Sequence, residues 1–134
     1  MRKIQHVPRI PSVNRRDFLQ RAACGFGGVA LHAMLAEYAQ RRDWLMPALT
    51  AAGFTYGHPG GAFYIYTNIS STGMAAPEFC ERLLRETGVM LFPGTMFGDD
   101  STDYIRISYL QPLPMIQEAM ARITAFASRT RAAA

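Results

Sequence analysis

The chain has 134 residues, of which 49% are hydrophobic and 18% charged, and this length and composition suit a single globular domain. Its formal net charge of +4 is unevenly distributed: residues 1–21 carry six Arg or Lys and one Asp, a net of +5, which leaves −1 for residues 22–134. A basic face for nucleic acid or a membrane is therefore not expected on the folded part.

The cysteines and histidines do not form a recognisable site. Cys24 lies in a run of small apolar residues and Cys80 in a segment of helical pattern, so neither a disulfide framework nor a CxxC motif is indicated. His6, His32 and His58 are widely separated and lack the spacing of metal ligands. We expect no bound metal.

The N-terminal segment resembles a twin-arginine export signal. Arg15 and Arg16 precede a charge-free run rich in small residues at 22–31. This run is too short and too rich in glycine to form a stable membrane span. A working signal would make the protein exported or periplasmic.

An ordinary amphipathic helix capped by Asn14 is the alternative interpretation of this segment. Gly25, Gly27 and Gly28 argue against it, since each glycine costs about 1 kcal/mol relative to alanine inside a helix. No clean cleavage site follows the apolar run.

From Leu35 onward the sequence alternates between helical and extended patterns. Apolar residues at steps of three and four predict a helix that Gly53 ends. Pro47 inside it marks either a kink or the start of a second helix. After the turn at 58–61, β-forming residues predict a strand within residues 54–69.

The second half of the chain gives four further elements. We predict helices at 74–87 and 112–127, and strands at 89–92 and 104–110. The loop between the last two strands is too short for a helical crossover, so the sheet should be mixed or antiparallel.

The predicted fold class is therefore α/β (α+β), a two-layer sandwich of a small mixed or antiparallel sheet with helices mainly on one face. We expect residues 1–33 to form a basic tail and signal-like segment, residues 34–128 to form the domain, and residues 129–134 to form a disordered tail.

Four sequence motifs carry a resemblance to a known family. They read GAFYIY at 61–66, FCERLL at 79–84, GVMLFPGTMFG at 88–98 and YIRISY at 104–109. In this order and spacing the segment from Met34 to Phe126 resembles the C-terminal small domain of class I/II (fold-type I) aminotransferases that use pyridoxal 5'-phosphate.

The resemblance implies a role for several residues. Arg106, in the YIRISY strand, would bind the α-carboxylate of an amino-acid or 2-oxo-acid substrate, because a guanidinium is a two-pronged donor that suits a carboxylate. Pro93 and Gly94 would form a loop on the cofactor side. Phe97, Gly61 and Phe63 would lie near the substrate.

Two of these assignments have structural alternatives. Arg106 could instead form an ion pair at the sheet edge with Asp99, Asp100 or Asp103. Phe97 could be an ordinary core residue.

Catalysis by the isolated chain is not expected. Lys3 is the only lysine, and it precedes every predicted element, so nothing would hold it as the lysine that carries the cofactor. The expected partner is an aminotransferase large domain or partner subunit, which would supply that lysine and the pyridoxal-phosphate site.

Without such a partner, some apolar surface should be exposed on the isolated domain. The candidates for this exposed patch are Tyr64, Tyr66, Phe92, Met96 and Phe97. Two other functions stay open at this point, namely an exported, non-catalytic interaction domain and a nonfunctional gene remnant. Family members generally work in the cytoplasm, so the location depends on which interpretation holds.

Overall fold

The computed structural model describes the backbone of residues 15–98 and 102–133, and the side chains of residues 28–98 and 102–132. The chain divides into two compact units, residues 1–35 and residues 36–134. The elements in chain order are α1 (Arg15–Ala51), β1 (Thr55–Tyr56), β2 (Tyr64–Asn68), the 3-10 helix η1 (Ser70–Thr72), α2 (Ala76–Thr87), β3 (Phe92–Pro93), the 3-10 helix η2 (Gly94–Phe97), β4 (Tyr104–Ser108) and α3 (Leu113–Ala133).

The described part of the first unit is the beginning of α1. Helix runs through Gly25, Gly27 and Gly28, so the expectation that these glycines would exclude a helix is wrong. Intrinsic propensity is a weak preference, and the cost of three glycines is spread over a helix of 37 residues. Pro47 lies within α1 and starts no second helix.

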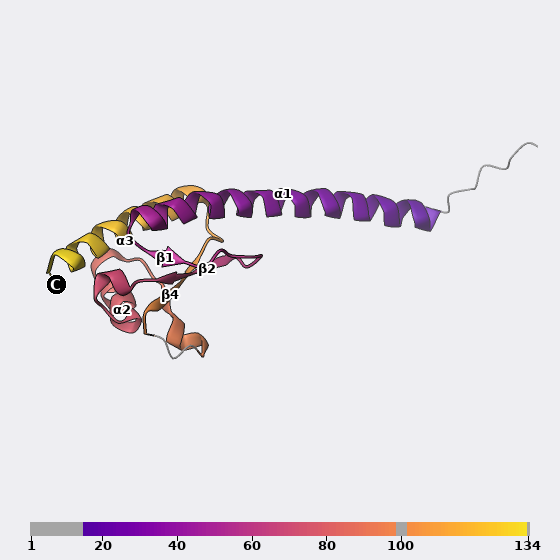
Figure 1. Cartoon of the computed structure of the whole chain (residues 1–134). Helices are drawn as coiled ribbons and strands as arrows, with labels where there is room; N and C mark the ends of the chain where they lie inside the picture. Colours follow the sequence, from indigo (N-terminus) through magenta and orange to yellow (C-terminus); the bar gives the residue numbers. More distant parts are fainter. Residues whose placement is uncertain (1–14, 99–101, 134) are drawn as a thin grey trace, which may run out of the picture. The chain divides into compact units, whose positions relative to one another are not determined.

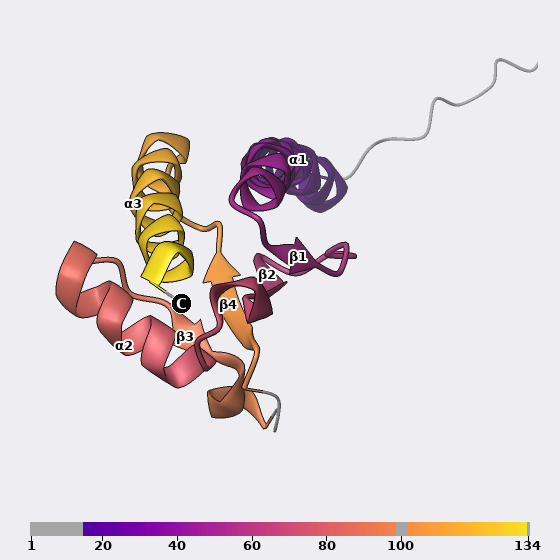
Figure 2. The ribbon, with the colours of Figure 1, turned by 60° about the vertical axis from the view of Figure 1, so that its left-hand side comes forward.

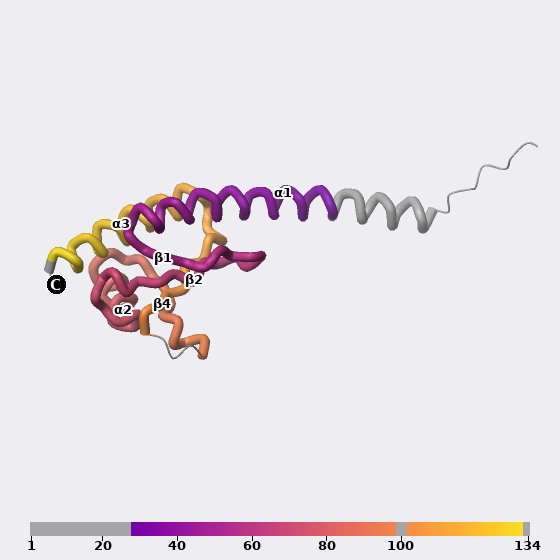
Figure 3. The backbone as a smooth tube through the Cα atoms, viewed as in Figure 1, coloured from indigo at the N-terminus to yellow at the C-terminus, as the bar shows by residue number. Residues whose placement is uncertain are grey.

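The second unit is built on a sheet of four strands in the order β1-β2-β4-β3, in which every neighbouring pair is antiparallel. Figure 2 shows α2 and α3 on the same side of this sheet as residues 36–51 of α1. The predicted two-layer α/β fold is thereby confirmed. Of the two sheet types that were predicted, mixed and antiparallel, the structure has the antiparallel one. The two-residue strands β1 and β3 flank the longer central pair, β2 and β4. The path of the backbone through these elements can be followed in Figure 3.

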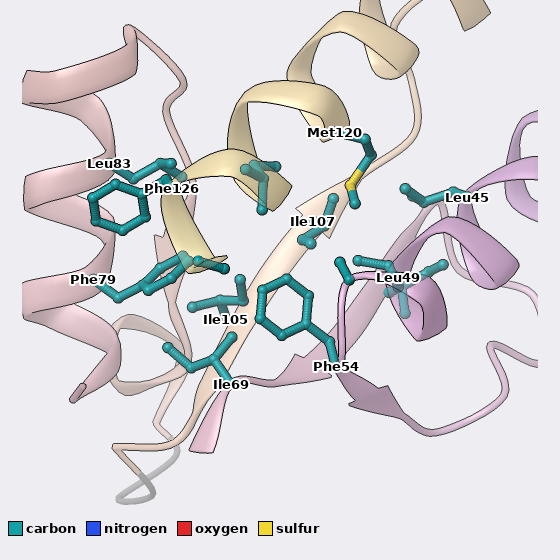
Figure 4. Packing of buried hydrophobic residues seen from close by; sticks show 14 of the residues in the cluster. Leu45, Leu49, Phe54, Ile69, Phe79, Leu83, Ile105, Ile107, Met120 and Phe126 are labelled. Atoms are coloured by element: carbon teal, nitrogen blue, oxygen red, sulfur yellow. The ribbon is translucent and has the colours of Figure 1, made fainter. Parts of the chain in front are cut away.

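The core lies between the sheet and its helices. Strands β2 and β4 alternate between buried and half-buried residues, so one face carries Ile65, Thr67, Ile105 and Ile107 inward. A chain of edge-to-face rings joins Phe54, which precedes β1, to Phe79 of α2 and Phe126 of α3, with centroid distances of 6.3 Å for Phe54–Phe79 and 5.2 Å for Phe79–Phe126. The other members shown in Figure 4 include Leu45, Leu49, Ile69, Leu83 and Met120.

The C-terminal end differs from the predicted disordered tail at 129–134. Helix α3 continues to Ala133, and Ala134 lies outside the described residues. The reason is that Arg131 donates a hydrogen bond to the Ala52 carbonyl and its guanidinium carbon lies 5.6 Å from the centroid of the Phe54 ring. The preceding Thr130 is buried. These contacts fix the last turn of the helix.

The short third strand also differs from the prediction. Residues 89–91 are not extended into the sheet, and pairing begins at Phe92, opposite Arg106. Gly88 ends α2 in the left-handed conformation with φ of 74°. The Val89 N–H then donates to the Thr87 hydroxyl, so Val89 is still bonded to the end of α2, and residues 89–91 form an irregular connection to β3.

No helix in the described part of the chain is long and apolar enough to cross a membrane.

Candidate functional site

Arg106 lies on the open face of the sheet, opposite the core. Because side chains alternate along a strand, Ile105 and Ile107 point into the core and Arg106 points away from it. Its register partners are Tyr66 on β2 and Phe92 on β3. Arg106 is half-buried in this position.

Two aromatic rings hold the Arg106 guanidinium. Its central carbon lies 4.0 Å from the centroid of the Tyr64 ring and 4.6 Å from that of Phe97. Both distances are within the range of cation–π attraction. Phe97 in turn meets Phe92 edge-on, with the centroids 6.4 Å apart. The guanidinium is therefore positioned by packing on rings, which leaves hydrogen-bonding groups at its edge for another partner.

None of the ion pairs that the structure shows within residues 28–98 and 102–132 includes Arg106. The alternative of an ion pair with Asp103 is therefore not found. Asp99 and Asp100 lie outside the described residues.

Phe97 is not a core residue. It is the last residue of η2, and 52% of its surface is exposed. The core-packing alternative for Phe97 is therefore wrong. In the predicted exposed patch, Phe92 and Met96 are also exposed, whereas Tyr64 and Tyr66 are half-buried.

The loop with Pro93 and Gly94 sits tightly against the strands beneath it. Pro93 pairs with Ile105, and Gly94 starts η2. A Cβ atom at Gly94 would lie 1.9 Å from the hydroxyl oxygen of Tyr66 and 3.2 Å from the carbonyl oxygen of Tyr104. Glycine is favoured here because a side chain would collide with the end of the Tyr66 side chain and press on the Tyr104 carbonyl oxygen.

The turn that contains Gly61 and Phe63 is hydrogen-bonded to Tyr109, the residue that follows β4. The Tyr109 hydroxyl donates to the Ala62 carbonyl, and the Tyr109 N–H donates to the Phe63 carbonyl at 3.1 Å. Gly61 has φ of 154°, a conformation that L residues rarely adopt. These hydrogen bonds hold the backbone of Ala62 and Phe63 beside Tyr109, which directly follows β4.

An open groove of about 910 Å³ joins part of this set. Arg106, Phe97 and Phe63 all line it, whereas Gly61, Pro93 and Gly94 do not. The structure thus brings three of the six predicted residues to one surface, and the other three shape the backbone beside it. Their roles with a substrate or cofactor stay predictions.

Sequence reasoning did not assign Tyr64 to the Arg106 site. The signal was available in the alternation of the two strands, since Tyr64 and Arg106 both occupy outward positions. What the sequence could not supply was the register that pairs Tyr64 with Ser108, two residues from Arg106.

Among the side chains that the structure describes outside this surface, the titratable groups do not suggest a second reactive site. Burial raises the pKa of the Cys80 thiol to about 11, so this thiol stays protonated and unreactive near neutral pH. Burial is also the main reason that the pKa of Tyr109 is raised. Among the described residues, no cluster of His, Cys, Asp and Glu could hold a metal ion.

The described residues do not fit a complete cofactor site. They contain no lysine, because the single lysine of the sequence is Lys3, which lies outside them. Residues 15–98 and 102–133 therefore offer no lysine amine to which such a cofactor could be attached.

Comparisons with known proteins give a consistent result. A sequence model of the family described as "Aminotransferase class I and II" matches residues 12–123. An aspartate aminotransferase of Pyrococcus horikoshii is 41% identical over 95 residues, which are 70% of this chain and 24% of that protein. Aromatic-amino-acid aminotransferase 2 of Thermococcus litoralis is 37% identical over 94 residues, again 24% of that protein.

Among solved structures, an aromatic aminotransferase from Pyrococcus horikoshii matches with a TM-score of 0.72 and 31% identity. The match covers 87% of this chain and 28% of that one. The chain thus spans about a quarter of the length of these relatives.

The family match includes the segment around Arg15 and Arg16, for which an export signal is predicted. That signal and the location it implies remain predictions.

Proposed function

Because this chain belongs to the class I and II aminotransferase family, we propose that its second unit is the substrate-carboxylate-binding part of a pyridoxal-phosphate enzyme. The complete enzyme would transfer an amino group between an amino acid and a 2-oxo acid. The observation that carries this proposal is Arg106, a half-buried guanidinium held by two rings on an open face, with no ion pair among the described residues.

Arg106 is suited to a carboxylate for geometric reasons. A guanidinium presents parallel N–H groups that match the two oxygens of a carboxylate, and such charge-assisted pairs are stronger than neutral hydrogen bonds. The rings of Tyr64 and Phe97 restrict the side chain before any ligand arrives, which lowers the entropy lost on binding. Arg106 would therefore bind and orient the substrate by its α-carboxylate.

The remaining chemistry would come from a complementary polypeptide. Pyridoxal phosphate, when bound, supplies the electron sink for chemistry at the substrate's α-carbon. The lysine and phosphate-binding residues that hold it would lie in the roughly three quarters of the family enzymes that this chain does not match. By itself the chain should be inactive.

The proposal can be tested by complementation. The full chain is mixed with the N-terminal three quarters of the Pyrococcus horikoshii aspartate aminotransferase and pyridoxal phosphate, and turnover of aspartate and of phenylalanine is measured. Activity should appear only in the mixture. Arg106→Ala should lower kcat/KM about 100-fold, because about 2.7 kcal/mol of carboxylate binding is lost.

Three controls make this result specific. Arg106→Lys should retain only part of the activity, since it keeps the charge and loses the two-pronged geometry. Arg85→Ala should behave as wild type, because Arg85 is an exposed residue of α2 paired with Glu81. Cofactor absorbance should be equal in all variants. Turnover by Arg106→Ala within threefold of wild type would show that Arg106 is assigned wrongly.

A further inference from the structure

Of the two rings that hold the Arg106 guanidinium, Tyr64 is the nearer and the better fixed. Its centroid lies 4.0 Å from the guanidinium carbon, against 4.6 Å for Phe97. Tyr64 is a half-buried residue of β2 and lies opposite Ser108 in the antiparallel pair with β4. Phe97 is an exposed residue at the end of the short helix η2. Tyr64 is therefore the ring that the sheet itself fixes beside Arg106.

The Tyr64 side chain is supported by the residue before it. Its ring meets that of Phe63 edge-on, with centroids 5.8 Å apart and planes at 81°. The Phe63 carbonyl accepts hydrogen bonds from the Tyr109 N–H at 3.1 Å and from the Ser108 hydroxyl at 3.5 Å. Packing against a neighbour that is itself hydrogen-bonded leaves a side chain few other rotamers. The Tyr64 ring should therefore keep its place whether or not a ligand is bound.

The rings of Tyr64 and Phe97 lie on different sides of the guanidinium. Both centroids are within 4.6 Å of the same carbon, yet no contact joins the two rings among the described residues. Their ring neighbours are instead Phe63 and Phe92. A guanidinium stacks on an aromatic ring by its flat face, so two rings on different sides leave only its N–H edge for a ligand. A carboxylate must then bind at this edge, close to the plane of the guanidinium.

We propose that Tyr64 is a positioning residue, which fixes the plane of the Arg106 guanidinium and thereby the direction from which the substrate carboxylate binds. This inference rests on the function proposed above. An arginine side chain has several rotatable bonds, and ordering them on binding costs free energy unless they are ordered already. Tyr64 orders Arg106 in advance, so the carboxylate meets a guanidinium that already points the right way.

A ring suits this task better than an acidic side chain would. An aspartate or glutamate beside Arg106 would also restrict it, but would occupy the same N–H groups that the substrate needs. The face of a tyrosine ring attracts the cation and leaves those N–H groups unused. None of the ion pairs found within the described side chains includes Arg106. The ring face, and not the hydroxyl of Tyr64, should therefore carry the effect.

The test uses the full chain alone, with acetate as the probe ligand at constant ionic strength. Nuclear magnetic resonance follows the Nε–H group of Arg106, identified by its loss in Arg106→Lys. Relaxation of this group gives the order of the guanidinium, and its shift during titration gives the dissociation constant of acetate. Tyr64→Leu removes the ring, and Tyr64→Phe keeps the ring and removes the hydroxyl. Tyr64→Val is a second variant without the ring, because a β-branched residue suits a strand.

Tyr56→Leu is the matched control for the loss of a tyrosine. Tyr56 is a half-buried residue of β1, and its hydroxyl donates to the Met46 carbonyl at 2.8 Å. Its replacement should lower stability without reaching the guanidinium. Thermal unfolding of each variant verifies its fold, so a change in stability is separated from a change at Arg106.

Tyr64→Leu and Tyr64→Val should make the guanidinium more mobile and weaken acetate binding by about three- to tenfold. Tyr64→Phe and Tyr56→Leu should stay within about twofold of wild type, because the ring beside Arg106 remains. Acetate binding by Tyr64→Leu and Tyr64→Val equal to that of wild type would overturn the inference and leave the proposed function standing. Equal weakening by Tyr56→Leu would overturn it too. Absence of acetate binding at Arg106 in the wild-type chain would refute the carboxylate site, and the inference with it.

Discussion

Replacing Gly94 with alanine should destabilise the fold through one identifiable clash. The new Cβ would lie 1.9 Å from the Tyr66 hydroxyl oxygen and 2.9 Å from the ring carbon that bears it. Tyr66 cannot easily move away, because its ring stacks on Tyr104 with 5.2 Å between centroids and 7° between planes. Either the stack opens or η2 shifts outward, and the second movement would displace Phe97 from Arg106.

Overpacking of this kind costs about 1–3 kcal/mol. For a domain of roughly 100 residues, each 1 kcal/mol lowers Tm by about 4–8 °C, so a fall of about 4 to 24 °C is expected. Circular dichroism during heating and during urea titration measures it. Gly60→Ala is the control, since a Cβ at Gly60 meets nothing within 4 Å, and it should stay within about 0.5 kcal/mol of wild type.

A double-mutant cycle ties the effect to the tyrosine. Tyr66→Phe removes the nearest clashing atom, so Gly94→Ala should cost less in the Tyr66→Phe background than in wild type, by about 0.5 kcal/mol or more. Recovery should be partial because the ring carbon remains at 2.9 Å. If Gly94→Ala unfolds at the same temperature as Gly60→Ala, the close approach described for η2 is incorrect.

Two further changes test other parts of the fold. Burial raises the Cys80 pKa from 9.0 to about 11, so the folded state keeps a proton that the unfolded state loses. Stability should therefore be complete below pH 9 and fall between pH 9 and 11, by at most about 2.7 kcal/mol, as seen in urea midpoints. Cys80→Ala should lack this part of the decline, and an equal decline would refute the assignment. Arg131→Met should cost about 1–2 kcal/mol, because it removes the hydrogen bond to Ala52 and the contact with Phe54. Hydrogen exchange should quicken in the last turn of α3, and unchanged protection there would show that Arg131 does not hold that turn.

The antiparallel pairing of β3 with β4 was predictable from sequence, but the register of β2 against β4 was not. Alternation in residues 104–108 sets Ile105 and Ile107 against Arg106, and the short connection requires antiparallel pairing. Tyr64 lies over Arg106 because it pairs with Ser108, which makes Tyr64 a diagonal neighbour of Arg106 on the same face. That relation depends on how two distant segments align, which neither segment encodes alone.

The two ends of the chain were the least predictable parts. Local glycine content suggested an interruption within residues 25–28, yet helix α1 continues through them. At the other end, Ser128 to Ala133 carry little apolar character, and their order comes from long-range contacts such as Arg131 with Phe54 and Arg129 with Glu86. Apolar periodicity reveals the buried apolar face of a helix. It does not reveal a guanidinium such as that of Arg131, which donates a hydrogen bond to a residue far away in the sequence.

The position of Arg106 ties the candidate site to the core beneath it. Ile105 and Ile107 are nearly inaccessible, and a slip of one residue in the β2–β4 register would turn both towards solvent and Arg106 into the core. Such a slip would bury a charge at a cost of several kcal/mol and expose two isoleucines, so the register is strongly determined. The carboxylate site should therefore be lost together with the fold. Among folded variants whose strands β2 and β4 are unchanged, variation in affinity should come from η2, because it carries the Phe97 ring that packs on Arg106.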